Sequence, residues 1–493
     1  MKTIYTLLLL LVAVSLPSCN DWLDVRPDTE QKEEDQFSNE KSFESAVIGM
    51  YMDMADRDIY GERLTMTNIE SLANLWYMDS DHNRYEDYYL MQHDYSNVEY
   101  SQAAIEAIYA KLFNVIVQAN IIIKNAVEHG DVIADPAMRS VIEGEAYAVR
   151  AYCQFDALRL FGQVPGGTEQ VSLPYSETTT IYEVPPYYDF NAYVEKLKSD
   201  IEKAKSLLLD NDPVCHYSFS SLNNSYDDGV DNFMIYRQSR MNYWAVRALE
   251  ARMYLYIGDK TTAYQIAKEI INATLDGNPV MTMSGVSDFA AGYKLCPSEC
   301  LFYLSKYDVM DYSSEFLVGG QESFSTWGDL GITHDMYLTL YAGQNSDSHN
   351  RMLNCWNTKA QDNYGDMMTV TTKYYWDAEN VTNAMLYYQL IPMLRMSEIY
   401  LIAMECTTDL NEANSLYRTY MLAHDVSNAA DFQSLDEVET FILNEYRREF
   451  FVEGQMFYTY KRLNCTEMLW RDEPVSEDEY ILPLPTTEYN PNN

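Results

Sequence analysis

Two segments share one helix–turn–helix pattern, and this repeat constrains the fold more than any other feature of the sequence. In the first, the helical stretch 251–257 ends at a Gly258-Asp259 turn and a second helical stretch follows. In the second, the stretch 398–403 is followed by a helical stretch from 410 to 416. Small residues recur where the two helices of a pair approach closely, and a single pair cannot bury its own apolar face. The repeat therefore predicts a scaffold of stacked helix pairs.

Apolar residues at helical spacing predict further helices along most of the chain. The clearest stretches are 102–128, 136–161, 189–209, 243–256, 262–273 and 436–464. The helix pairs resemble tetratricopeptide-like hairpins, although their spacing departs from the strict tetratricopeptide repeat length. We therefore expect a mostly α fold in which tetratricopeptide-like helix-turn-helix pairs form the scaffold.

Two segments interrupt the helical pattern and are dense in aromatic residues. They cover about 59–100 and 277–390, and the second is rich in tyrosine, tryptophan and polar runs. Long stretches without regular structure are uncommon in compact domains unless they are functional. We expect these segments to be loops with some short strands, and to form a large ligand-binding face.

The N-terminus has the organisation of a secretion signal. Lys2 is followed by an apolar run too short to span a bilayer of roughly 30 Å. Ser18 precedes Cys19, and Leu16 lies two places before Ser18, a spacing that resembles the bacterial lipobox. Cleavage at a lipobox leaves the cysteine as an acylated N-terminus. The alternative is an ordinary secretory signal with a cysteine at its end by chance.

The sequence predicts three parts in the chain. Residues 1–18 are expected to be a lipoprotein signal peptide, and residues 19–39 a lipidated N-terminus and tether. Residues 40–493 are expected to form a single domain that carries the two loop-rich segments as insertions. With 47% hydrophobic residues, this part of the chain has enough apolar surface for a large core.

The formal net charge of −41 restricts the possible partners. So acidic a surface argues against binding to nucleic acid and against docking on anionic lipid head groups. It favours a neutral ligand or a protein partner. The 43 tyrosines supply flat apolar faces with a hydrogen-bonding tip, which suit such ligands.

The cysteines do not form the pattern of a disulfide framework. Seven remain besides Cys19, and they are scattered widely. Cys296 and Cys300 are close enough in sequence to close a small loop or to bind a metal, but no second cysteine pair supports a zinc site. The sequence leaves open whether these two residues pair.

A series of short motifs occurs in order along nearly the whole chain. They are Cys19 with Leu23-Asp24-Val25-Arg26-Pro27, the helical stretches 145–152, 245–258 and 394–403, and the closing stretches 448–454 and 482–490. Together they resemble the SusD/RagB family of outer-membrane nutrient-binding lipoproteins from Bacteroidota. No single motif is decisive, but their order supports the resemblance.

The resemblance implies a function as well as a fold. Such proteins are lipid-anchored at the outer membrane and face the cell exterior. There they sit as a lid over a SusC-like TonB-dependent transporter and capture a glycan for import. The resemblance implies a binding protein without catalysis and without a cofactor, with ligand contacts made by the loop segments.

Sugar binding needs flat rings for the apolar side of a pyranose and fixed polar groups for its hydroxyls. The loop around residues 76–85 offers both, and the second loop-rich segment offers further rings. We expect ligand contacts among Trp76, Tyr77, Asp81, Asn83, Arg84, Tyr85, Tyr312, Trp327 and Trp356. For each of these aromatic residues the alternative is that the ring packs a loop onto the scaffold.

The sequence assigns no metal and no catalytic residue. Asp79, Asp81 and Asn83 have the oxygen spacing of a calcium loop, but Arg84 stands where the turn glycine would be and Leu90 where the terminal glutamate would be. A polar ligand-binding loop is the better interpretation, and a structural calcium ion is unsupported. Acidic pairs of the glycosidase kind occur everywhere in so acidic a chain and carry no weight.

Two other function classes remain open at this stage. One is a capture protein for peptides, as the RagB branch of the family implies. The other is a surface glycosidase, which would release new reducing ends from a polysaccharide. Both differ from the glycan-capture function in what they bind or in what they do to it.

Overall fold

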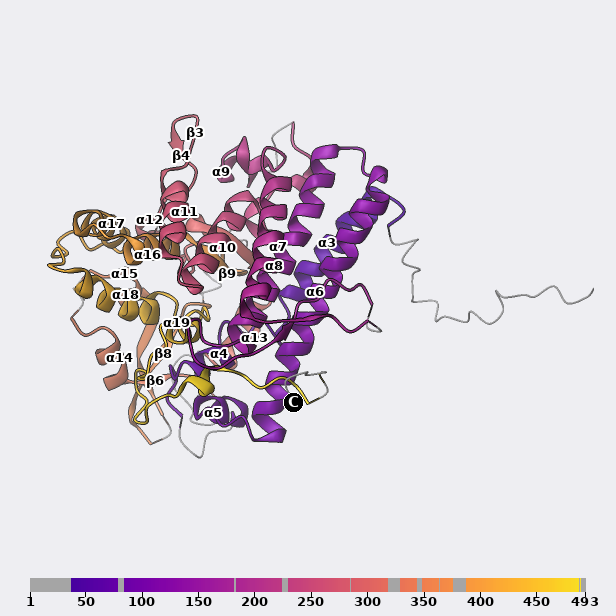
Figure 1. Ribbon diagram of the computed structural model, residues 1–493. Helices are drawn as coiled ribbons and strands as arrows, with labels where there is room; N and C mark the ends of the chain where they lie inside the picture. The colour runs from indigo at the N-terminus through magenta and orange to yellow at the C-terminus, as the bar shows by residue number, and fades with distance from the viewer. Residues whose placement is uncertain are drawn as a thin grey trace, which may run out of the picture.

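The computed structural model describes residues 37–78, 84–180, 183–223, 229–283, 285–317, 329–343, 348–362, 364–375, 387–486 and 488. Helices dominate these residues (Figure 1). The longer ones are α3 (Glu40–Met54), α6 (Ala103–His129), α7 (Pro136–Phe161), α8 (Phe190–Leu208), α10 (Tyr243–Tyr256), α11 (Lys260–Asn272), α16 (Met396–Cys406), α17 (Leu410–Ala423) and α18 (Leu435–Glu449). The shorter ones are α4 (Asn68–Leu72), α5 (Tyr85–Met91), α9 (Phe219–Leu222), α12 (Gly285–Ala290), α13 (Val309–Ser314), α14 (His334–Leu340), α15 (Asn350–Asn354) and α19 (Met456–Arg462).

Short turns join consecutive helices into the antiparallel pairs that the repeat predicts. Between α10 and α11 the chain turns at Gly258, whose φ of 87° few residues other than glycine adopt. Asp259 then caps α11 by accepting a hydrogen bond from the Thr262 N–H at 3.0 Å. Asp409 caps α17 in the same way through the Asn411 N–H. The mostly α architecture of helix pairs is confirmed.

The strands are short and belong mainly to the second loop-rich segment. β5 (Cys300–Ser305) pairs with β9 (Leu390–Arg395), and β8 (Met367–Thr371) lies between β6 (Ile332–Thr333) and β7 (Trp356–Gln361); all these pairings are antiparallel. Two-residue strands form the pairs β1 (Leu173–Pro174) with β2 (Tyr187–Tyr188) and β3 (Thr274–Leu275) with β4 (Asn278–Pro279). The segment 277–390 therefore contains short strands, as expected, together with α12 to α15.

The helical motifs are joined to one another by buried ion pairs. Arg252 of α10 makes a bidentate contact with Glu398 of α16, with distances of 2.7 Å and 2.6 Å. Arg150 of α7 makes the same kind of contact with Asp200 of α8, at 2.7 Å and 2.6 Å. Paired guanidinium and carboxylate groups of this geometry bond strongly and fix orientation. The charged motif residues thus hold helix pairs together inside the fold.

A second buried cluster joins the third helical motif to the closing one. Arg395, the last residue of β9, contacts Glu299 at 2.6 Å, Glu449 at 2.7 Å and Glu453 at 2.8 Å. Lys373 also contacts Glu453. All five side chains are almost completely buried, and buried Arg351 contacts both Glu299 and Glu449, so that three positive groups balance three carboxylates.

The first loop-rich segment is packed more tightly than its sequence suggests. Gly454 has a φ of 71°, and a Cβ atom there would lie 2.1 Å from the carbonyl oxygen of Leu64. The Gly454 N–H donates to the Glu70 carboxyl group at 2.8 Å. This close approach ties α4 to the C-terminal motif, and burial raises the pKa of Glu70 to about 8.

The described cysteines are all free thiols. The Sγ atom of Cys300 lies 3.5 Å from the carbonyl oxygen of Cys296, and Cys296 faces the Arg351 guanidinium at 3.8 Å. The possible disulfide between Cys296 and Cys300 is therefore absent. Burial raises the pKa of both thiols, which makes them unreactive core residues.

Candidate ligand-binding face

The two loop-rich segments meet on one side of the scaffold. The Tyr77 N–H donates to the Gly331 carbonyl at 2.9 Å, and the Tyr312 hydroxyl donates to the Gly61 carbonyl at 2.5 Å. The guanidinium of Arg57 lies 4.7 Å from the centre of the Tyr312 ring. In Figure 1 α4, α5 and α13, which carry or flank these residues, lie near one another in the lower half of the molecule. Segments far apart in sequence thus form one face.

Arg84 is fixed in this face by two carboxylates. Its Nε atom donates to Asp87 at 2.5 Å, and its Nη2 atom lies 3.4 Å from Glu62. Glu62 also accepts from Arg57 at 2.6 Å. The Arg84 guanidinium lies 5.1 Å from the centre of the Phe316 ring. The structure therefore brings the predicted residue Arg84 to the same region as the predicted residue Tyr312, with its charge already paired.

Three of the predicted rings pack inward. Trp76 is only 2% exposed and meets Phe451 edge-on at 5.0 Å between ring centres. Trp356 is half-buried, lies 4.8 Å from the same Phe451 ring and donates its Nε1–H to the Tyr341 hydroxyl at 2.9 Å. Tyr312 is 5% exposed. In this structure Trp76 and Tyr312 pack the loops onto the scaffold and offer no open ring face.

Tyrosine rings supply the open aromatic surface. Tyr77 is 36% exposed and Tyr85 is 44% exposed. Tyr85 lies 5.2 Å from Tyr100, and Tyr89 stacks on Tyr100 at 5.7 Å with 6° between the ring planes. Sequence reasoning did not select Tyr89 and Tyr100. The spacing of four residues between Tyr85 and Tyr89, which puts both on one side of a helix, was the signal that could have identified Tyr89.

Tyr307 is a second exposed ring that sequence reasoning did not select. It lies two residues beyond the end of β5 and is 78% exposed. The ammonium group of its neighbour Lys306 lies 5.6 Å from the Tyr312 ring centre. Tyr307 therefore stands close to the region where the two loop-rich segments meet.

Several predicted residues lie outside the described residues. They are Cys19, Asp81, Asn83 and Trp327, and most of the calcium-like spacing falls there too. Asp87, the described end of that stretch, is fully buried and accepts from Asn68 at 2.7 Å and Ser71 at 3.0 Å as well as from Arg84. The oxygens of Asp87 are thus already engaged by protein donors.

Within the described residues, the side chains with the spacing of a metal site are His424, Glu445 and Glu449. All three side chains are fully buried. Arg351 contacts Glu449 and lies 2.6 Å from Nδ1 of His424, and Arg448 lies 2.8 Å from Glu445. Burial and the neighbouring Arg351 guanidinium lower the pKa of His424. Guanidinium groups already neutralise these carboxylates, so the cluster fits a core ion-pair network better than a metal site.

Paired helices that carry a loop-built aromatic face define a class of helical scaffold proteins. Within that class, the chain belongs to the SusD family, because residues 210–492 match the model described as the SusD family. Residues 21–221 match a related family model described as starch-binding and associating with the outer membrane. The resemblance drawn from the sequence motifs is confirmed.

Two curated relatives come from Formosa agariphila. One SusD-like protein is 22% identical over 536 aligned residues, which cover 98% of this chain and 97% of the relative. Another is 25% identical over 158 residues, which cover 32% of this chain and only 30% of that relative. The first alignment spans nearly the whole chain, as the two family models do together.

Solved structures share the fold. The crystal structure of a SusD superfamily protein from Bacteroides thetaiotaomicron matches with a TM-score of 0.67 and 19% identity, and covers 92% of this chain and 98% of that chain. A laminarin-binding SusD-like protein matches with a TM-score of 0.62 and 16% identity, over 91% of this chain and 97% of that one. At these identities the likeness concerns the fold.

Proposed function

We propose that this protein is a cell-surface lipoprotein that binds an oligosaccharide or polysaccharide and delivers it to a partner transporter. In this proposal Cys19 carries the lipid anchor at the outer membrane, and the partner is a SusC-like TonB-dependent barrel. The chain itself performs no catalysis. The family membership, the description of one family model as starch-binding and the laminarin-binding relative support a glycan as ligand.

The observation that carries the proposal is a group of tyrosines in which Tyr85 is exposed and Tyr89 and Tyr100 are partly exposed. The rings of Tyr85, Tyr89 and Tyr100 lie within 6 Å of their neighbours, with Tyr77 exposed nearby in sequence on the same loop-rich segment. A pyranose ring has an apolar side that packs on such rings, while hydroxyl groups of tyrosine bond its polar edge. Arg84, the neighbour of Tyr85 in sequence, is held by Asp87 and Glu62 and fixes the loop that carries these rings.

The electrostatics favour a neutral glycan over an acidic one. Arg57, Arg63 and Arg84 each lie within 3.4 Å of a carboxylate of the same region. The whole chain carries a formal charge of −41. An anionic polysaccharide would be repelled by this surface, whereas a neutral glucan would not be.

The test is a glycan and peptide array with the purified mature chain, followed by calorimetry with the best ligand. We expect Tyr85→Ala to weaken glycan binding about tenfold, because it removes an open ring from the face. The matched control is Tyr217→Ala, since Tyr217 is 40% exposed and lies next to α9, at the opposite end of the molecule from α5 in Figure 1. The control variant should bind as the unmodified chain does.

Other outcomes would contradict the proposal in distinct ways. Binding to peptides and to no sugar would favour the RagB-like alternative. New reducing ends after incubation with a polysaccharide would show a surface glycosidase. Equal losses from Tyr85→Ala and Tyr217→Ala would show that the ligand binds elsewhere.

A further inference from the structure

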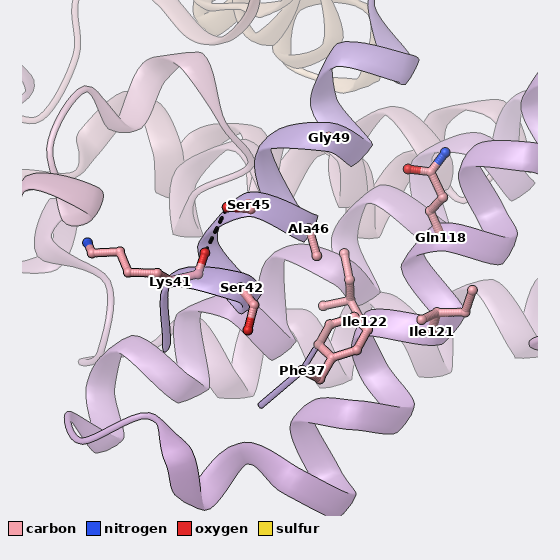
Figure 2. Close-up of a pocket in the computed structure, with 9 residues that line it drawn as sticks. All are labelled: Phe37, Lys41, Ser42, Ser45, Ala46, Gly49, Gln118, Ile121 and Ile122. Carbon is pink, nitrogen blue, oxygen red and sulfur yellow. Dashed lines mark hydrogen bonds between the residues drawn. The ribbon is translucent and has the colours of Figure 1, made fainter. Parts of the chain in front are cut away.

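A groove runs between α3 and α6 at the point where the described chain begins (Figure 2). It has a volume of about 580 Å³. Its floor is formed by Phe37 and Ala46 on one side and by Ile121 and Ile122 on the other, as the sticks in Figure 2 show. Ser42, Ser45 and Gln118 supply polar atoms at its rim.

The groove is open on the side of α3 because of Gly49. A Cβ atom added at this glycine would meet no atom within 4 Å. A glycine inside a helix costs stability relative to alanine, and nothing in the described packing requires it here. The missing side chain leaves room for another group to lie against α3.

The segment that precedes Phe37 carries a short apolar stretch in an otherwise polar sequence. Residues 28–36 contain no apolar side chain, whereas Trp22, Leu23 and Val25 lie just before them. Phe37 is itself part of the groove and packs on Phe43 at 4.8 Å between ring centres. The chain therefore leaves the described fold directly at the groove.

We propose that residues 22–25 fold back and dock in this groove as an extended strand. Side chains two residues apart point to the same side of an extended chain, so Leu23 and Val25 face the apolar floor and Asp24 faces solvent. Trp22 then lies along the rim. The inference concerns the tether and does not depend on what the loop-built face binds.

The covalent connection to the groove favours this occupant over a separate protein. Residues 26–36 form a linker of eleven residues between Val25 and Phe37. A short flexible linker keeps the segment at an effective concentration of about a millimolar, so even weak docking is populated.

Docking would shorten the tether. Seventeen residues separate Cys19 from Phe37. Fully extended, they reach about 60 Å at roughly 3.5 Å per residue. With residues 22–25 docked, only Asn20 and Asp21 remain between Cys19 and the docked segment, which limits the span to about 10 Å. The body would then stay close to the membrane with the α3 and α6 side toward it.

Hydrogen exchange measured by mass spectrometry on the full mature chain tests the proposal. We expect Leu23→Asp to speed exchange roughly tenfold in peptides that cover residues 42–49 and 118–122, because it puts a charge on the apolar floor. Asp24→Ala is the matched control and should change exchange less than about twofold. Circular dichroism should be unchanged for both variants, since neither touches the described core.

A variant of the groove itself provides the second measurement. Gly49→Gln fits the helix and fills the groove, so it should speed exchange of peptides that cover residues 20–27 by a similar factor. Adding Leu23→Asp to Gly49→Gln should then have no further effect on the groove peptides. Unchanged exchange with Leu23→Asp would overturn the proposal. An effect that grows with protein concentration would also overturn it, since it would mean docking into a second molecule.

Discussion

At the scale of single residues, the carboxyl group of Glu70 has an unusual environment. It is fully buried on α4, accepts from the Gly454 N–H, and has a pKa raised to about 8 by burial. In the unfolded chain the same group titrates near 4.5. The folded state therefore holds a proton that the unfolded state loses between these two pKa values.

This predicts that stability falls as pH rises from about 4.5 to about 8. Glu70→Gln mimics the protonated acid and should flatten that fall, with a gain on the order of a few kcal/mol in the free energy of unfolding at pH 8. Urea denaturation at a series of pH values measures it. Glu128→Gln, at an exposed position of α6, is the control and should leave the slope unchanged.

Substitutions at Tyr312 and Tyr85 should separate an effect on stability from an effect on ligand binding. Tyr312→Phe leaves the buried Gly61 carbonyl without its donor and should lower the free energy of unfolding by about 1–2 kcal/mol while glycan affinity stays the same. Tyr85→Ala should weaken glycan binding while the free energy of unfolding stays the same. Urea denaturation and calorimetry of both variants test this. A loss of glycan affinity in Tyr312→Phe would show that Tyr312 contributes to ligand binding.

The sequence could not distinguish these two kinds of ring. Trp76 and Tyr85 lie in the same aromatic loop, yet Trp76 is buried because Phe451, close to the other end of the chain, comes to lie against it. Burial of a loop residue depends on such distant contacts. Composition and spacing identified the aromatic segment, and the tertiary contacts determined which of its rings remain open.

At the scale of elements, helix pairing depends on buried ion pairs. Removing one partner of such a pair strands a charge, whereas removing both does not. Arg252→Met should therefore destabilise the chain by about 3–5 kcal/mol, and the Arg252→Met, Glu398→Leu double variant by clearly less. Urea denaturation of both single variants and the double variant gives the coupling. If the double variant lost as much free energy of unfolding as the two single variants together, Arg252 and Glu398 would not be coupled.

The free thiols give a second prediction at this scale. Cys296 and Cys300 are buried at the start of β5, whereas Cys215 and Cys465 are partly exposed. A reductant should leave the melting temperature unchanged. An alkylating reagent on the native protein should modify Cys215 and Cys465 first. Thermal denaturation measures the first result and peptide mapping the second. A mass loss of two hydrogens in the peptide 296–300 would contradict the prediction.

The helices were predicted from the sequence, whereas the pairing of the strands was not, and the difference has a physical reason. The helices follow from apolar spacing within each stretch, so α6, α7 and α10 appear where the periodicity indicates them. The pairing of β5 with β9 joins residues about ninety positions apart, from Cys300 to Arg395. No local pattern encodes such a pairing, so the sequence showed only that short strands were present.

At the scale of the whole molecule, the charge of −41 shapes how a ligand approaches. Binding of a neutral glycan should change little between about 0.02 and 0.5 M salt, since no net charge is screened. An acidic polysaccharide should bind weakly at low salt and gain affinity as salt rises. Calorimetry across this range measures both. A steep loss of affinity for a neutral glycan with rising salt would contradict the expectation.

The family motifs explain why the fold was predictable when the ligand was not. Their charged residues, such as Arg150, Arg252 and Arg395, pair with carboxylates inside the scaffold. Motif recognition therefore identifies the scaffold and says little about the glycan. The two loop-rich segments, 59–100 and 277–390, lie outside the motifs on which the resemblance rests.

The inward placement of the motif residues also has an evolutionary consequence. Substitutions at Arg252 or Glu398 threaten folding, whereas substitutions at Tyr85 or Tyr307 fall on exposed rings that the core does not need. Substitutions that alter the open rings and substitutions that endanger folding thus fall on different residues. The loop-built face can therefore change its surface chemistry while the helix pairs that support it keep their structure.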